Sequence, residues 1–280
     1  MKKINFILIV VLTFGMLSLN SCKKRKANRS TITSQDNAAA EAAFNDVFKI
    51  TEDALKDNDL EKSNVSLRSI GANCATVTIN PPLPDTTFPK TVTIDFGTTN
   101  CIDSYGVNRR GVITAVITGK YRTVGTQISI TTQDYYVNDI KVEGTKEVTN
   151  LGPNSNGNTE FSVEISNAKI TYTSGDEVTY QSSRIREWVV GESTQGLFGV
   201  LDDEYDITGT ASGIDRNGLA YTMLVTSPLR VAVLCRWIKK GTVEIQPDGL
   251  YLRTVDFGTG DCDAAATVEI NNNVYNFNMN

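Results

Sequence analysis

The chain has 280 residues, with 27 Lys and Arg against 32 Asp and Glu and no histidine. This length is enough for one large or two modest domains. Residues 65–280 alone hold 17 basic and 24 acidic side chains, which excludes a nucleic-acid partner because such a partner needs a basic surface. The lack of histidine excludes Ser-His-Asp and Cys-His nucleophile arrangements and His-ligated metals within the chain.

Residues 1–21 have the order of a secretory signal peptide. The chain opens with MKK, continues with the apolar run INFILIVVLTFGMLSL and then reaches a small-residue cleavage zone. The run is too short and wrongly flanked for a comfortable transmembrane helix. We therefore predict an exported protein.

The four residues LNSC resemble the lipobox of bacterial lipoprotein signal peptides, with Leu19 at minus three, Ser21 at minus one and Cys22 at plus one. Asn20 stands where that pattern more often has Ala, Ser or Thr. The resemblance implies that Cys22 is acylated through its thiol, becomes the new N-terminus and is then acylated on its amine, which would hold the protein on a lipid bilayer. The alternatives are an ordinary signal peptide with an incidental cysteine and an uncleaved anchor helix.

Residues 22–35 form a predicted basic tether. Lys23 and Lys24 replace the aspartate that signals inner-membrane retention in many such bacteria, so the outer membrane is the expected destination. The tether also lacks the acidic residues that mark surface export in some lipoprotein families, which favours the periplasmic face. We expect the tether to be solvated. Its KKRK run either rests on anionic head groups or only keeps the linker soluble.

Residues 36–64 contain the one predicted helix, followed by a linker. Asp36 or Asn37 can cap its start, and its alanines favour a helix. Apolar side chains recur at three- and four-residue spacing, which predicts a stripe that packs on the protein's own sheet or, alternatively, on a partner. The stripe consists of Ala40, Phe44, Val47, Phe48, Thr51 and Leu55.

Residues 65–280 form the predicted β domain. Short segments rich in Val, Ile, Thr and Tyr alternate with period two, and turn signals such as SGDE, DRNG, QPDG and INNNV separate them. Strands do not alternate with amphipathic helices, which excludes a doubly wound parallel sheet. We predict a mainly β fold, either an antiparallel sandwich or a long twisted meander of hairpins.

A nine-residue phrase occurs twice in this domain. TIDFGTTNC at 93–101 returns as TVDFGTGDC at 254–262, with six identities and a displacement of 161 positions (262 minus 101). Alternation places Phe96 and Phe257 on an inward face, and the glycine after each Phe permits a tight turn. We predict that a β unit was duplicated and that both copies are structural equivalents.

Four cysteines remain once the lipid-bearing Cys22 is set aside. Cys74 and Cys101 are 27 positions apart, and Cys235 and Cys262 are also 27 apart. An even number in an exported chain predicts disulfides, and of three possible connectivities the matched spacing favours Cys74 with Cys101 and Cys235 with Cys262. Each bridge would contribute about 3 to 4 kcal/mol. A metal or redox role is the alternative, but C-x-x-C spacing is missing.

The acidic segment LDDEYD is a candidate for calcium binding. Several oxygen ligands are offered by Asp202, Asp203, Glu204 and Asp206, but the EF-hand pattern of ligands and its glycine are missing. We therefore prefer to interpret this segment as a solvent-exposed stretch of chain that leads into a hairpin. No other metal site and no cofactor are predicted.

Aromatic side chains offer a second candidate binding site. Tyr135, Tyr136, Trp188 and Trp237 could line a carbohydrate or peptide groove, although aromatics at period-two positions more often belong to a core.

Two classes of function follow. The first is a non-catalytic envelope lipoprotein, held on the bilayer through Cys22, that serves as a binding or structural β module for an envelope protein or glycan. The second is a histidine-free carboxylate hydrolase, glycosidase-like, on the same anchor. The absence of any site motif favours the first.

Overall fold

The computed structural model describes residues 26–57, 74–82, 84–103, 106–194, 202–235 and 237–279. The predicted signal peptide and Cys22 lie outside the described residues. The side chain of Leu55, the last member of the predicted helical stripe, is outside them as well. Within the described residues, no helix has the length and apolarity that crossing a membrane requires.

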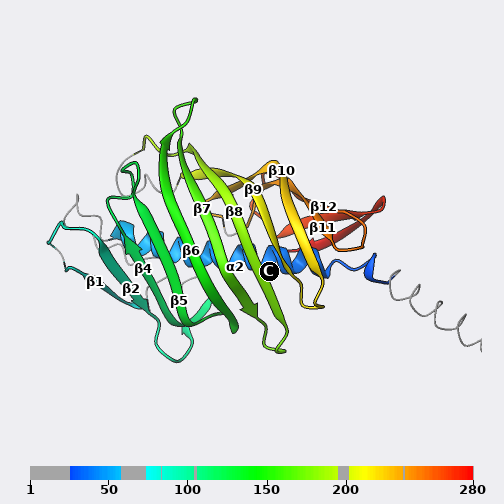
Figure 1. The fold of residues 1–280 in the computed structure, drawn as a ribbon, viewed down its shortest axis with the longest axis horizontal. Coiled ribbons are helices and arrows are strands. Elements are labelled where there is room, and N and C mark those ends of the chain that lie inside the picture. Colours follow the sequence, from blue (N-terminus) through cyan, green and yellow to red (C-terminus); the bar gives the residue numbers. More distant parts are fainter. Residues whose placement is uncertain are drawn as a thin grey trace, which may run out of the picture.

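The strands form one antiparallel sheet in which each strand pairs with the next in sequence, except that β2 pairs with β4 and the short β3 pairs only with β4 (Figure 1). Of the two predicted architectures, this is the long meander. Hairpin connections favour it, because sequential strands joined by short turns become neighbours. The strands are β1 (Thr76–Asn80), β2 (Lys90–Asp95), β3 (Cys101–Ile102), β4 (Asn108–Ile117), β5 (Gln127–Val137), β6 (Ile140–Pro153), β7 (Thr159–Thr171), β8 (Glu177–Val190), β9 (Glu204–Ile214), β10 (Ala220–Ala232), β11 (Lys240–Pro247), β12 (Arg253–Thr259), β13 (Ala265–Ile270) and β14 (Asn273–Asn278).

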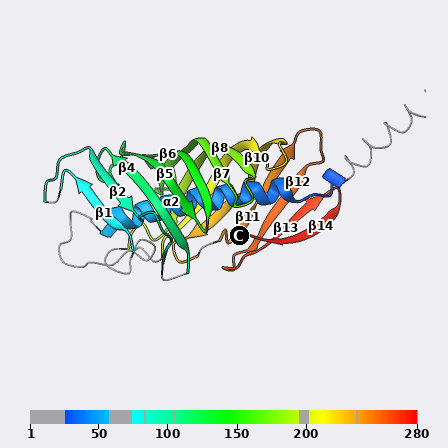
Figure 2. The same cartoon turned by 90° about the horizontal axis from the view of Figure 1, so that it is seen from below.

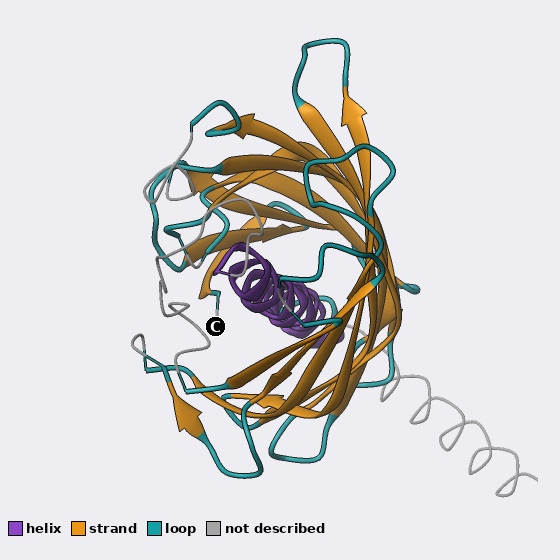
Figure 3. Cartoon of the chain, turned by 90° about the vertical axis from the view of Figure 1, so that its left-hand side faces the viewer, coloured by secondary structure: helices purple, strands orange, loops and turns teal. Residues whose placement is uncertain are grey.

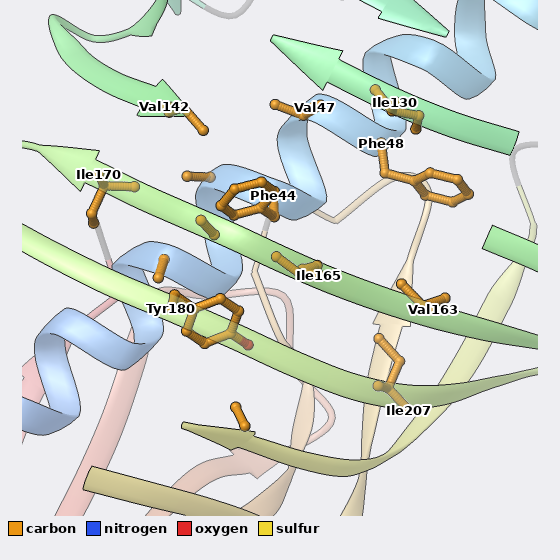
Figure 4. Packing of buried hydrophobic residues seen from close by; sticks show 14 of the residues in the cluster. Phe44, Val47, Phe48, Ile130, Val142, Val163, Ile165, Ile170, Tyr180 and Ile207 are labelled. Atoms are coloured by element: carbon orange, nitrogen blue, oxygen red, sulfur yellow. The ribbon is translucent and has the colours of Figure 1, made fainter. Parts of the chain in front are cut away.

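The sheet curves around a single helix, α2 (Ile32–Asp57), which runs across the strands along the concave face (Figures 2 and 3). The predicted stripe packs on the protein's own sheet: Phe44, Val47 and Phe48 are buried against apolar side chains from several strands (Figure 4). Because the sheet surrounds the helix, burial extends beyond the stripe to polar residues such as Asp36 and Glu41.

The helix begins four residues before the predicted start, and the end of the predicted tether is docked rather than solvated. Thr33 and Ser34 are buried, and the Thr33 hydroxyl donates to Asp215 Oδ2 at 2.7 Å. The buried Arg253 guanidinium donates to the carbonyl oxygens of Ala27 and Ser30. The polar composition of the tether suggested solvation, but a buried guanidinium requires acceptors, and these backbone carbonyls supply them.

Both disulfides join the predicted partners, Cys74 with Cys101 and Cys235 with Cys262. They lie far apart in the strand order, one beside β1 and β3 and the other between the end of β10 and the end of β12. Each bridge therefore ties a short local segment near one end of the meander.

The two copies of the repeated phrase share the geometry of the Asp–Phe–Gly segment, although β2 ends at Asp95 and β12 continues to Thr259. Phe96 and Phe257 are both buried, at 5% and 4% exposure. In each copy the aspartate before the Phe accepts a hydrogen bond from the glycine N–H after it, at 2.7 Å in the first copy and 2.8 Å in the second. The glycines, Gly97 and Gly258, both have positive φ. The aspartate therefore stabilises the turn.

The strands that precede the two copies of the phrase, β1 and β11, occupy different positions in the sequence relative to the phrase. Thr76 pairs with Asp95, and Thr242 pairs with Asp256. The threonines are 166 positions apart (242 minus 76) and the aspartates 161 (256 minus 95), so a shift of five residues separates the preceding strands. The equal cysteine spacing hides this shift, because the second copy has a longer connection into β11 and a shorter one out of it.

Candidate functional site

Three carboxylates of α2, five residues apart, each meet an arginine and a tyrosine; two of these pairs come from strands, and the third comes from the connections that follow β7 and β9. Asp36 accepts from the Tyr172 hydroxyl at 3.0 Å and from Arg216 Nε at 2.7 Å. Successive carboxylates are rotated by about 140° and raised by about 7.5 Å along the helix. Such a series finds partners because the sheet and its hairpin connections curve around the helix (Figure 3).

The other two members repeat the arrangement. Glu41 accepts from Tyr180 Oη and from Arg184 Nη2, the latter at 2.8 Å. Asp46 accepts from Arg109 Nε at 3.2 Å and from the Tyr135 hydroxyl at 3.2 Å. We call these three clusters the acid–arginine–tyrosine ladder: Asp36, Arg216 and Tyr172; Glu41, Arg184 and Tyr180; Asp46, Arg109 and Tyr135.

This ladder holds the helix in place and lacks the features of an acid–base centre. Burial by itself raises the pKa of Glu41, but the charge of Arg184 and the hydrogen bond from Tyr180 outweigh it, and the pKa lies below its usual 4.5. A general acid needs the opposite shift. In each member of the ladder the carboxylate is paired with a cation and not with a second carboxylate.

We expect four tyrosines to resist ionisation in the folded protein. Burial raises the pKa of Tyr135, Tyr172, Tyr180 and Tyr221 above the usual 10, and nearby carboxylates raise it further. Because each pKa is higher in the folded state, the associated stability is fully present below about pH 10 and is lost as the pH rises beyond it. Phenolate absorbance should therefore show these tyrosines ionising together with the loss of the circular dichroism signal.

Tyr180→Phe is the matched control. It should remove one phenolate from the ionisation that accompanies unfolding at high pH, and it should leave the ionisation of the other tyrosines near pH 10 unchanged. If all ten tyrosines titrated near pH 10 while the fold remained intact, the buried ladder would be wrong.

The acidic segment does not form a shared cation site. Glu204 is ion-paired with Arg230 and Lys239, and Asp206 is ion-paired with Arg230. Asp203 is buried and accepts from Trp188 Nε1 at 3.2 Å, while Asp202 accepts from a threonine hydroxyl. Among the described residues, no group of three metal-ligating side chains could hold an ion. The calcium hypothesis therefore has no geometric support.

The four candidate aromatic residues do not line a common groove. Tyr135 and Trp188 are core residues, buried to 0% and 2% exposure. Tyr136 lies under the Arg110 guanidinium, and Trp237 is half-buried and donates to the carbonyl of Met279. The preferred interpretation of aromatics as core thus holds for the two buried rings.

A groove of about 720 Å³ lies across β7 to β11, lined mainly by side chains on the sheet face opposite α2. Buried neighbours such as Ile165 and Met223 point to the core, so the side chains between them point outward. The groove is lined by Glu164, Ile165, Ser166, Gln181, Ser182, Ser183, Thr210, Ala211, Ser212, Thr222, Met223, Leu224, Glu244, Gln246 and Leu252.

Strand pairing arranges the outward side chains of the groove in two transverse rows. In the first row, which we call the glutamate row, each member pairs directly with the next: Glu147, Glu164, Ser183, Thr210, Leu224 and Glu244. In the second, the hydroxyl row, the members in the groove are Gln181, Ser212, Thr222 and Gln246. The groove is thus a regular array, with neighbours about 4.8 Å apart along a row.

The hydroxyl row continues beyond the groove towards the other end of the sheet. Direct pairs connect Thr78 on β1 to Ser166 on β7. The members between them are Thr93, Thr114, Thr131 and Thr145. An irregularity in the pairing of β7 with β8 lies between this part and Gln181.

The polar side chains of the groove are suited to hydrogen bonding, and the exposed side chains of Leu224 and Leu252 add apolar surface beside them. The hydroxyl and amide groups of the groove both donate and accept, and Ser183 Oγ already donates to Glu164 Oε1 at 2.7 Å. The two lining carboxylates, Glu164 and Glu244, lie four strands apart, or about 19 Å along the sheet. A pair of glycosidase carboxylates is separated by about 5 to 9.5 Å.

No family model, curated protein or solved structure matches this chain.

Sequence reasoning missed both the rows and the ladder. Outward Thr and Ser residues at period two were visible along each strand, but which of them stand side by side depends on register. The five-residue spacing of Asp36, Glu41 and Asp46 was also visible, although it matches no single helix face.

Proposed function

We propose that this protein is a lipid-anchored lipoprotein of the bacterial envelope whose β domain binds another envelope component through the outer-face groove without catalysing a reaction. The groove is the observation that carries the proposal. It is open and hydrogen-bonding, whereas the opposite sheet face is occupied by α2 and the core. The expected location of the protein is the periplasmic face of the outer membrane.

Two further observations support an exported protein. Both disulfides require an oxidising compartment. The leader and the lipobox resemblance at residues 19–22 supply the route and the anchor.

The chemistry of the groove indicates the kind of ligand. Hydroxyls, amides and two carboxylates suit a partner rich in hydroxyl or amide groups, such as a glycan or a polar protein surface. A hydrolase is less well supported because the lining carboxylates are too far apart to act on one bond.

Replacing Cys22 with serine tests the anchor. The variant should lose all label from a radioactive fatty acid and should leave the membrane fraction or stall as the uncleaved precursor. Cys74, Cys101, Cys235 and Cys262 remain in this variant, so any residual label would have to come from another site. A Cys22→Ser protein that is still acylated and membrane-bound would contradict the proposal.

Photocross-linking in intact cells tests the binding role. A benzophenone side chain at Ser183 or Ser212, both in the groove, should give one discrete adduct with an envelope component. Ser129 and Ser162, which lie on the same sheet face but do not line the groove, are the matched controls and should give none. Equal adducts at all four positions, or none at any, would contradict binding through the groove.

A further inference from the structure

The strand β14 forms one edge of the sheet. It pairs with β13 on one side, and on the other it pairs with no described strand. The β13–β14 hairpin closes through Asn271 and Asn272, which both have positive φ, as a two-residue turn requires. Its register runs without a bulge from Ile270 paired with Asn273 to Ala265 paired with Asn278. The edge is therefore regular along its whole length.

This edge lacks the features that normally prevent strands from pairing between molecules. Natural edges carry charged side chains, prolines or bulges. The last ten residues, NNNVYNFNMN, contain no charge and no proline, and polar asparagines alternate with Val, Tyr, Phe and Met. Val274, on the outer face, is 64% exposed. Alternation of this kind favours addition of a further strand.

The other edge of the sheet is less open. β1 has five residues, and the prolines Pro81 and Pro82 follow it immediately. Just before the strand, Cys74 is tied to Cys101. Prolines cannot donate to an added strand, so pairing along this edge would be short.

We propose that β14 pairs antiparallel with β14 of a second copy of this chain, about a two-fold axis at Asn276. In a two-residue hairpin the closing pair is hydrogen-bonded, so Asn273, Tyr275 and Phe277 direct their backbone groups to β13. The alternate residues direct theirs to the open edge. These are Val274, Asn276 and Asn278.

The register about Asn276 is self-complementary. It places Asn276 opposite itself, where the two amides can donate to and accept from each other. Val274 then stands opposite Asn278 of the second copy. On the inner face Tyr275 stands opposite Phe277 of the second copy, an aromatic cross-strand pair of the kind that stabilises sheets. No like charges meet, because the segment has none.

The position of the edge is compatible with two molecules held on one membrane. Arg253, which binds the carbonyls of Ala27 and Ser30, pairs with Ile270, and Ile270 pairs with Asn273. The first described residues, around Ala27 and Ser30, therefore lie at the same end of the sheet as the start of β14 (Figure 2). Attachment to one membrane would raise the effective concentration of the second copy, and this contribution rests on the proposed anchor. The pairing itself does not depend on it.

Light scattering on the purified full-length chain in detergent tests the pairing. The wild type should double in protein mass as its concentration rises. Val274→Lys should remain a monomer throughout, because it places a charge on the edge in both copies. Thr267→Lys adds the same charge to the same sheet face one strand inward, on β13, and should still dimerise.

Cysteine cross-linking tests the register. Under mild oxidation Asn276→Cys should give a covalent dimer, since a hydrogen-bonded antiparallel pair has Cα atoms about 5.5 Å apart, within disulfide range. Val274→Cys should cross-link much less, because in this register it faces Asn278. Asn156→Cys at the exposed β6–β7 hairpin should not cross-link.

Three results would overturn the inference. They are a wild type that is monomeric at every concentration, Val274→Lys dimerising as well as wild type, and a series of larger species, which would indicate pairing of β14 with β1. Because the assay uses purified protein, a failed anchor would leave its outcome unchanged.

Discussion

Glu41→Gln is expected to destabilise the fold by about 3 to 5 kcal/mol, which is the usual effect of removing one partner from a buried ion pair. The side chains of Glu41 and Arg184 are only 8% and 3% exposed, so water cannot easily replace the lost carboxylate. Arg184 already has two buried nitrogens, Nε and Nη1, without a hydrogen-bond partner, and the change would leave its charge uncompensated. Urea unfolding followed by circular dichroism measures the loss.

A double variant separates an unpaired charge from a loss of packing. Glu41→Met combined with Arg184→Met removes both charges and keeps similar volume, and it should recover much of the stability lost in the single variant. Glu177→Gln, which breaks an exposed ion pair with Lys169, should change stability little. A single variant as stable as wild type would mean that the helix does not need this pair.

Phe96→Ala and Phe257→Ala are each expected to cost about 3 to 5 kcal/mol, because both remove a buried ring and leave a cavity. Phe96 packs against Tyr135 with ring centroids 5.9 Å apart, close to the Asp46 member of the ladder. Phe257 belongs to the same core from β12. Equal losses in the two variants, measured by denaturant unfolding, would support equivalent roles for the two copies of the phrase.

Tyr251→Ala is the control for this pair of variants. It also removes an aromatic ring, but that ring is 50% exposed, so the expected change is within about 0.5 kcal/mol. None of the three substitutions should change lipid labelling. A Phe variant with unchanged stability and a selective loss of binding would contradict the structural role of the phrase.

Local sequence patterns were enough to predict which secondary-structure elements occur and in what order. Alternation with period two is a property of each strand alone, and turn residues such as Asn271 and Asn272 act within a few positions of the chain. The helical stripe through Phe44 and Phe48 is equally local. These signals therefore predicted a β meander or sandwich, one helix packed on the sheet and the inward phenylalanines.

The disulfide pairing could be chosen from the sequence for a different reason. The cysteines of each repeated unit are 27 residues apart, and a duplication preserves such a spacing in both copies. The same evidence could not reveal the five-residue shift between β1 and β11, because insertions in two loops compensate each other between the cysteines.

What the sequence by itself determined is thus the secondary structure, the local bridges and the expectation of export. Only the tertiary structure decided that the strands form one continuous sheet that surrounds α2, so that Asp36, Glu41 and Asp46 meet arginines on separate elements. It also decided which outward residues share a row in the groove and that β14 is left at an edge. The physical reason is that register, curvature and edge position depend on contacts between residues far apart in the chain, and a period read along one strand carries no information about its neighbour.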